Sequence, residues 1–531
     1  MAARVLEGRL RPRLAALLAM LAVGAASAGN QPPPWLTTKT PYQPQQRMAT
    51  LEPVPTDFLP LHTQLVARHG ARGMSGAKQE LALLQLWRAA RAEGALTPLG
   101  RRLGPDLERL LRVNARLGEG VEGVRRPGFG NLSRLGMAEH QGLARRLLQR
   151  MPALFDVSDM KRRGGRIELL SSGVDRAEDS AQVFIRALLA DRPALAAWVH
   201  RPVLEGYPAN APKAQAAGTN RFLLYFHKLN AATDLVLDPA DPAYLSYQRS
   251  QAYQAAADDA EVAAKLAAVQ ADPALRRTAR HVLERLFSAE FVASLEQGER
   301  QFRNEGLLAG AARAKGQPAA AMTLGDGRTV LRSAVDVLMA LSAAYEIAPG
   351  LRQELGGHDF RAYLPEDAAK LLAWANDAED FYVKGPGIAE HGTVNHAMAG
   401  QLIDEMFAQV LKAAQATDTA GRDLASFRFS HAEILIPLAS ALELPGMHVQ
   451  LPAVQLYRYD NNPWRGERVA PYSANLQWDA WRERKTGKIW LRMLHNERQT
   501  AFKPACDAAR LRPGSFFYEL TQLRACYGTA G

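Results

Sequence analysis

Short apolar runs alternate with amphipathic stretches along the first 200 residues. The run Leu61–Ala67 predicts a strand that ends at Arg68, and Ile167–Ser171 predicts a second strand. Apolar residues at helical spacing predict helices over four further stretches: Lys78–Glu93, Pro98–Asn114, Leu132–Gln149 and Ala177–Ala190. Because strands alternate with helices, we expect an α/β sandwich.

The pattern changes between residues 201 and 375. Alanine becomes frequent, β-branched residues become rare, and long amphipathic stretches are separated by short Asp, Pro and Gly breaks. Strand and helix patterns then return, with predicted strands at Ser426–Ser430, Gln450–Tyr459, Tyr472–Trp478 and Lys488–Leu494, and predicted helices at His431–Leu442 and around Phe516–Cys526. We therefore expect an α/β core built from residues 56–200 and 376–531, with a mostly α-helical insert at 201–375.

The N-terminus has the pattern of a secretory signal. Four arginines precede the apolar stretch Leu14–Val23, and Ala26-Ser27-Ala28 offers a cleavage site after Ala28. We expect residues 1–28 to be removed, which leaves a periplasmic or secreted protein with no stable membrane insertion. A retained anchor is the alternative, although the apolar stretch is short for a membrane span. Residues 29–55, rich in Pro and Gln, predict an extended arm.

Composition and charge narrow the class of protein. The chain has 531 residues, 47% of them hydrophobic and 22% charged, which is typical of a folded protein with a large core. The net charge is +11, and about +8 remains without the signal segment, which favours anionic partners. Cys506 and Cys526 are the two cysteines, and in an oxidising compartment we expect a disulfide between them. Two free thiols are the alternative.

The segment Arg68-His69-Gly70-Ala71-Arg72 carries the strongest chemical signal. It follows a predicted strand, at the edge where open α/β sheets bind ligands. Guanidinium groups match phosphate oxygens, and Gly70 permits a close approach of the backbone. A histidine between two such groups is suited to attack phosphorus while the arginines stabilise the developing charge. A solvated basic turn with a chance histidine is the alternative.

Two other segments offer complementary groups. His431 and Glu433 lie where a predicted strand leads into a helix, so His431 is suited to hold a phosphate oxygen and Glu433 to protonate a leaving group. Arg176, after the second predicted strand, is suited to join the same site. The alternatives are a carboxylate that stabilises a helix N-terminus, and a surface arginine paired with Asp175 or Asp179.

Together these segments resemble the histidine phosphatase superfamily, in its acid phosphatase branch. His431-Ala432-Glu433 is similar to the motif of the multiple inositol polyphosphate phosphatases, a clade of phytases, and the contexts Phe381–Gly387 and Pro471–Leu476 agree. The resemblance implies an α/β core with an α-helical cap and chemistry without metal or cofactor. It implies that His69 forms a phosphohistidine, that Glu433 donates the proton, and that the phosphoryl group is held by Arg68, Arg72, Arg176 and His431. Lys384 would contact outlying substrate phosphates.

The sequence also departs from that family. Gly73-Met74-Ser75 replaces a Tyr-Pro pair, and Tyr225-Phe226-His227-Lys228 replaces a Phe-Asp-His-Cys-like string, which puts substrate preference in doubt more than catalysis. His391 and His396 near Glu390 form only a weak metal pattern.

The expected function is hydrolysis of phosphates from inositol polyphosphates such as phytate, which are small-molecule substrates. Two alternatives stay open: a broad acid phosphatase acting on sugar phosphates, and a non-catalytic inositol-phosphate-binding protein. Nucleotide-binding glycine motifs do not occur in the sequence, and neither does the basic–aromatic interleaving typical of nucleic-acid binding. The oligomeric state is left open.

Overall fold

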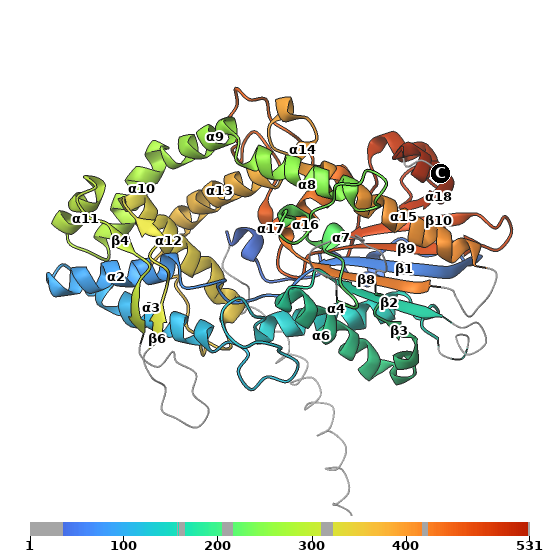
Figure 1. The fold of residues 1–531 in the computed structure, drawn as a ribbon, viewed down its shortest axis with the longest axis horizontal. Coiled ribbons are helices and arrows are strands. Elements are labelled where there is room, and N and C mark those ends of the chain that lie inside the picture. The colour runs from blue at the N-terminus through green and yellow to red at the C-terminus, as the bar shows by residue number, and fades with distance from the viewer. Residues whose placement is uncertain are drawn as a thin grey trace, which may run out of the picture. The chain divides into compact units, whose positions relative to one another are not determined.

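A mixed β-sheet forms the centre of the protein (Figure 1). The computed structural model describes residues 35–156, 158, 165–203, 216–308, 322–416 and 423–528, so the expected signal peptide lies outside the described residues. Eight strands of this part of the chain follow the order β11-β10-β9-β1-β8-β2-β3, with β12 paired to β10. Their bounds are β1 Phe58–Arg68, β2 Arg166–Ser171, β3 Val199–His200, β8 Asp423–Ser430, β9 Asn475–Glu483, β10 Ile489–His495, β11 Arg498–Gln499 and β12 Phe517–Glu519.

The sheet is parallel on one side of β1 and antiparallel on the other. β1 runs parallel to β8, β8 to β2, and β2 to β3. On the other side, β9 is antiparallel to β1, and β10 is antiparallel to β9. The parallel strands β1, β8 and β2 therefore end at the same edge of the sheet. Arg68 at the end of β1 is in register with Ser430 at the end of β8, and Ser171 at the end of β2 is in register with Phe429.

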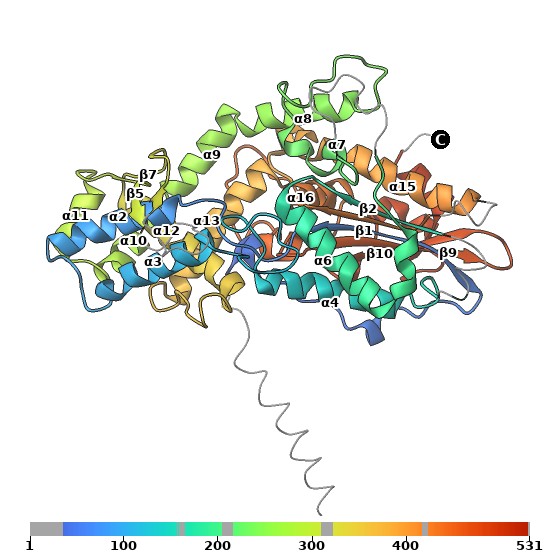
Figure 2. The same ribbon diagram turned by 60° about the horizontal axis from the view of Figure 1, so that its bottom comes forward.

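Helices cover both faces of the sheet (Figures 1 and 2). On one face, α4 (Arg134–Arg150) and α6 (Asp175–Asp191) pack on Leu65 and Ala67 of β1 and their neighbours. On the other face, α15 (Gly400–Gln415) and α16 (Ala432–Ala441) contact β1, and Val66 belongs to that second core. Successive strand residues point to opposite faces, so one apolar strand supplies both cores.

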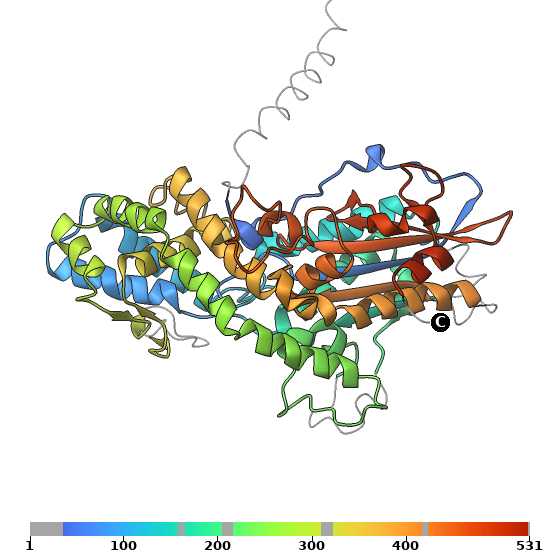
Figure 3. The same ribbon diagram turned by 90° about the horizontal axis from the view of Figure 1, so that it is seen from above.

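A helical layer extends from one end of the sheet, as Figure 3 shows from above. It includes α8 Tyr244–Ala257, α9 Ala260–Gln270, α10 Pro273–Glu284, α11 Ala289–Glu296, α12 Ala334–Ile347 and α13 Glu366–Val383. It also includes two short antiparallel strand pairs, β4 Phe302–Arg303 with β7 Val330–Leu331 and β5 Gly306–Leu308 with β6 Met322–Leu324. Two helices from earlier in the chain, α2 (Gln79–Ala92) and α3 (Gly100–Ala115), join this layer, because α2 packs on α3 and on α12.

The remaining helical pieces are short. They are η1 Thr37–Lys39, η2 Met48–Thr50, η3 Pro193–Trp198, α7 Arg221–Leu224, η4 Phe226–Lys228, η5 Ala348–Leu351, η6 Ala389–His391, α14 Val394–Ala397, α17 Gly466–Val469, η7 Pro504–Ala509 and α18 Leu520–Cys526. Within the described residues, Ala334–Leu351 is the one stretch long and apolar enough to cross a membrane, and 72% of it is buried inside the protein.

The structure confirms the α/β prediction and most predicted elements, with one clear error. Gln450–Tyr459 was predicted as a strand but consists of turns, with a single bridge between Leu451 and Ile388. Pro452 cannot donate a ladder hydrogen bond. The apolar positions of this segment reflect packing on the helical layer instead, where Tyr457 stacks on Phe381 of α13. At the C-terminus, the first three residues of the predicted helix after Phe516 form β12.

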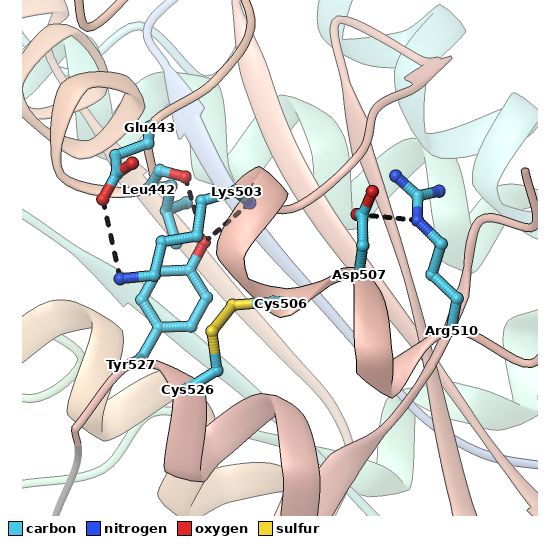
Figure 4. The surroundings of a disulfide bond; sticks show 8 residues. All are labelled: Leu442, Glu443, Lys503, Cys506, Asp507, Arg510, Cys526 and Tyr527. Atoms are coloured by element: carbon cyan, nitrogen blue, oxygen red, sulfur yellow. Dashed lines mark hydrogen bonds and ion pairs between the residues drawn. A yellow bond between two sulfur atoms is a disulfide. The ribbon is translucent and has the colours of Figure 1, made fainter. Parts of the chain in front are cut away.

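The predicted disulfide between Cys506 and Cys526 is present and joins η7 to α18 (Figure 4). The hydroxyl of Tyr527 donates to the carbonyl of Leu442 at 3.0 Å, and Lys503 pairs with Glu443 at 3.5 Å. The bridge therefore closes a C-terminal loop that is tied to the end of α16.

Candidate active site

Three motif segments meet at the edge where the parallel strands end. His69 follows β1, His431 follows β8, and Ser172 follows β2. The amide of His69 donates to the carbonyl of Ser430 at 2.9 Å, and the rings of His69 and His431 have centroids 5.5 Å apart. Segments that are more than 250 residues apart along the chain thus reach one point through strand pairing.

The environment of His69 sets its tautomer and its charge. Its Nδ1 lies 3.0 Å from the carbonyl oxygen of Gly70, and since a carbonyl only accepts, Nδ1 carries the hydrogen and Nε2 keeps its lone pair. Burial lowers the pKa of His69 well below its usual 6.5, and the charges of Arg176, Arg68 and Arg72 lower it further. The result is a buried, neutral imidazole with a nucleophilic nitrogen.

Gly70 is required by packing at this turn. A Cβ added there would lie 2.4 Å from the carbonyl oxygen of Gly136, in the first turn of α4. Gly136 in turn faces Ala71, whose oxygen would lie 2.1 Å from a Cβ at position 136. The two glycines therefore let α4 approach the turn that carries His69 and Arg72.

Arg68 is anchored by main-chain carbonyls. Its Nη1 donates to the carbonyl of Thr38, in the arm before β1, and to that of Ala470 at 2.6 Å. The guanidinium also lies over the ring of Tyr472, 4.8 Å from its centroid. Its Nε is buried and has no hydrogen-bond partner among the described residues, so part of the fork remains open to an anion.

Arg72, Arg176 and His431 complete a cationic pocket. The Nε atoms of both arginines and the Nδ1 of His431 are buried without a partner in the described part of the chain. Nε2 of His431 lies 2.9 Å from the hydroxyl of Ser172. Burial and the charge of Arg72 lower the pKa of Arg176 to about 10. Buried polar groups are nearly always hydrogen bonded, so these nitrogens suit a ligand with several acceptor oxygens.

The acidic neighbours of Arg176 have other partners. Asp175 pairs with Arg126 at 3.7 Å, and Asp179 accepts from the amide of Arg125 at 3.4 Å. In the described structure these two carboxylates therefore pair elsewhere, and not with Arg176 as the alternative interpretation of the sequence allowed.

Glu433 lies in the first turn of α16, directly after His431. Burial raises the pKa of Glu433, but the charges of Lys384, His227 and His431 outweigh this effect and hold it well below the usual 4.5. Lys384, which follows α13, pairs with Asp380 at 2.6 Å. Burial lowers the pKa of Lys384, whereas Asp380 and Glu433 raise it and prevail. The ammonium group of Lys384 thus pairs with Asp380 and also stabilises the charged form of Glu433.

A cavity of about 320 Å³ adjoins Arg72. Lys39 and Lys78 line it together with Glu80 and Thr329. Lys39, the last residue of η1, forms an ion pair with Glu346 at 2.5 Å. The cavity offers two further cations next to the pocket.

Sequence reasoning missed several residues of this region. Thr38 and Lys39 come from the arm, whose composition shows only an extended segment. Tyr472 lies within the segment Pro471–Leu476 and Ser172 directly follows the second predicted strand, but the sequence assigned neither of them a role. His227 lies 5.9 Å from His431, ring to ring, and was noted only as a departure from the family pattern.

One group elsewhere has the composition of a metal site. Asp259, Glu261 and His391 place ligand atoms within 4.8 Å of one another, and Nε2 of His391 lies 3.1 Å from Glu261. All three side chains are partly exposed. His391 therefore faces α9 instead of joining His396 and Glu390 in the pattern noted in the sequence.

Comparisons with known proteins identify related folds. The structure superposes on Bifidobacterium longum multiple inositol polyphosphate phosphatase in complex with inositol hexasulfate (TM-score 0.78) and with phosphate (TM-score 0.79), each 29% identical and covering 93% of this chain and 97% of that one. A phytase from D. castellii shares the fold, with a TM-score of 0.52 at 12% identity over 93% of this chain and 84% of that one. No curated protein sequence gives a match.

The family model of the histidine phosphatase superfamily (branch 2) matches residues 61–496. That span contains all three motif segments and the helical layer between them. The chain belongs to branch 2 of the histidine phosphatase superfamily.

Proposed function

We propose that this protein is a phosphomonoester hydrolase that removes phosphates from myo-inositol polyphosphates through a phosphohistidine on His69. The observation that carries the proposal is the neutral His69, with Nε2 unprotonated, beside three guanidinium groups that have unpartnered nitrogens. A phosphoryl group in this pocket meets a nucleophile and donors for its equatorial oxygens at once.

In the first step, Nε2 of His69 attacks phosphorus and the ester P–O bond breaks. Arg68, Arg72, Arg176 and His431 hold the phosphoryl oxygens, and Glu433 in its acid form gives its proton to the departing alkoxide. In the second step, the Glu433 carboxylate takes a proton from water, the oxygen attacks phosphorus, and the N–P bond breaks. Phosphate is released and Glu433 is an acid again, so protons balance over the cycle.

The low pKa of Glu433 gives this cycle a pH dependence. The free protein holds Glu433 as a carboxylate because of Lys384, His227 and His431. Substrate phosphates bring negative charge to the same cations, which raises the pKa of Glu433 towards the protonated form. Proton donation is therefore favoured by acidic solution and by a highly charged substrate.

Charge favours a polyphosphate over a simple monoester. Lys384 lies on the Glu433 side, and Lys39 and Lys78 line the cavity beside Arg72, so cations extend beyond one phosphate. The Bifidobacterium longum protein, 29% identical, has been crystallised with inositol hexasulfate. We assign the α-helical cap to residues 201–375, between core segments 56–200 and 376–531; it contributes Thr329 to the cavity, whereas the three lysines lie outside it.

We also propose that the protein is exported, with a signal peptide cleaved after Ala28. The disulfide supports an oxidising compartment, such as the periplasm or the exterior of the cell.

The test is phosphate release by purified protein beginning at residue 29, from acidic to neutral pH, with EDTA present. Phytate, p-nitrophenyl phosphate and glucose 6-phosphate are compared. We expect phytate to be the preferred substrate and EDTA to have no effect. Monoester hydrolysis without phytate hydrolysis would reduce the function to a broad acid phosphatase. Binding of phytate without any hydrolysis would make the protein a binding protein.

A further inference from the structure

His227 belongs to a segment that is fastened to the active-site edge of the sheet. The amide of Ser171 donates to the carbonyl of Gly218 at 2.8 Å, and the amide of Asn220 donates back to Ser171 at 2.9 Å. Further along, the hydroxyl of Ser430 donates to the carbonyl of Leu224. The segment is therefore held at the ends of both β2 and β8, and η4 follows directly from it.

The ring of His227 packs inside this edge. Its centroid lies 5.9 Å from that of His431 and 4.7 Å from that of Tyr225, which itself lies 5.4 Å from His431. Tyr225 is held in turn by Arg221, whose guanidinium lies 4.7 Å from the centre of its ring. Arg221 is fixed by Asp234 through two hydrogen bonds of 2.7 and 2.9 Å. Packing thus determines the position of the imidazole.

The imidazole has an unused polar atom. His227 is only 6% exposed, and its Nδ1 is buried without a hydrogen-bond partner among the described residues. Buried nitrogen atoms of this kind normally have a partner, so a ligand oxygen is the natural one here. The structural role of a packed aromatic ring would not need this atom.

Charged groups from four segments surround the ring. Burial lowers the pKa of His227 to about 4, Glu433 of α16 opposes this, and Lys228, Lys384 after α13 and Arg176 of α6 lower it further. His227 is therefore neutral over most of the acidic range. The rings of His227 and His69 both lie close to the ring of His431, with centroids 5.9 and 5.5 Å from it.

We propose that His227 is a further substrate-contacting residue, whose Nδ1 hydrogen-bonds a second phosphate group carried next to the ester that is cleaved. This inference rests on the proposed function. A small monoester fills the pocket of Arg68, Arg72, Arg176 and His431 and does not extend past His431. A second phosphate on the neighbouring carbon of a polyol ring extends past His431, where it contacts His227 and Lys384. His227 therefore selects for substrates with adjacent phosphates.

The variants His227→Phe and His227→Asn test this role. Phenylalanine keeps the packed ring without nitrogen, whereas asparagine keeps a polar atom near the position of Nδ1. We expect His227→Phe to raise KM for phytate by about tenfold to a hundredfold, the range for a hydrogen bond to a charged group. His227→Asn should recover much of that loss, and in both variants the loss of kcat/KM should be much smaller for p-nitrophenyl phosphate than for phytate.

Calorimetric binding of inositol hexasulfate and of inorganic phosphate provides a readout that is independent of turnover. His227→Phe should weaken the binding of inositol hexasulfate and leave the binding of inorganic phosphate unchanged. Its melting temperature should equal that of the wild type. Equal effects on both ligands, or none on either, would overturn the inference. A wild-type protein that neither binds inositol hexasulfate nor hydrolyses phytate would instead refute the proposed function, whatever the variants do.

Discussion

Arg68 donates through Nη1 to the main-chain carbonyl of Thr38, thirty residues earlier in the chain. The arm before β1 thereby takes part in positioning a guanidinium of the phosphate pocket. The same arm places Lys39 against Glu346 and pairs the carbonyl of Thr40 with the amide of Tyr472. The arm is therefore part of the site and not a passive leader to the fold.

Deletion of the N-terminal residues up to and including Lys39 should reduce kcat/KM for p-nitrophenyl phosphate by more than about tenfold. The reason is that Arg68 loses the carbonyl of Thr38, one of the two carbonyls that accept from its Nη1. Thr38→Ala is the matched control, since it removes a side chain but keeps the carbonyl, and it should remain close to wild type. Steady-state kinetics and thermal melting of both proteins check this. Equal activity of the two would show that Ala470 alone suffices to orient Arg68.

His69→Ala should abolish turnover while inorganic phosphate still binds. The three arginines and His431 remain in this variant, and they are the proposed phosphate contacts. Isothermal titration with phosphate, beside an activity assay, measures both properties. Loss of phosphate binding together with activity would make His69 a binding or structural residue instead of the nucleophile.

Glu433→Gln should slow phytate hydrolysis by about a hundredfold or more, the usual scale for general acid catalysis. p-Nitrophenol is a good leaving group and needs little protonation, so its ester should be affected much less. Comparing kcat on the two substrates decides the point. A uniform loss on both would contradict a role in protonating the leaving group.

The acidic limb of the pH profile should report His69. The proposed nucleophile is its neutral form, which is present above its pKa, and burial and then Arg176, Arg68 and Arg72 hold that pKa well below 6.5. Activity should therefore persist well into the acidic range and be lost only as pH falls through that low pKa. In Arg176→Gln, one of the opposing charges is gone, so the limb in kcat/KM should move to higher pH.

Arg126→Gln is the control for that shift. Arg126 is exposed and pairs with Asp175, next to Arg176 in the chain. Its removal changes the same net charge outside the pocket and should leave the limb in place. A similar shift in both variants would trace the effect to overall charge and not to Arg176.

Replacing both Cys506 and Cys526 by serine should lower the free energy of unfolding by about 3 kcal/mol, from the chain entropy of a loop of roughly 20 residues. The disulfide joins η7 to α18, and neither segment supplies a residue of the proposed pocket, so kcat should be unchanged. Chemical denaturation of the double variant, with phosphate release measured alongside, checks both parts. A fall in kcat at full folding would link this loop to the active site.

Much of the fold could be predicted because its signals are local. The strands around Leu65 and Leu169 are buried at nearly every position and rich in apolar residues, although Gln64 and Glu168 interrupt their apolar runs, and each strand leads into a polar turn. The same locality made Arg68, His69 and Arg72 visible as one group. The local pattern gave a wrong strand prediction at Gln450–Tyr459, because the apolar residues of this segment pack on α13, which is distant in the sequence.

The sequence by itself determined the α/β class, the strand ends that precede His69 and His431, and the expectation of a disulfide between the only two cysteines. These properties depend on residues that are neighbours along the chain, or on the number of cysteines. Tertiary structure alone decided that Thr38 anchors Arg68, that α2 packs on α12, and that His227 reaches His431. Such contacts join residues far apart in sequence, and they arise only when strand pairing and helix packing bring those segments together.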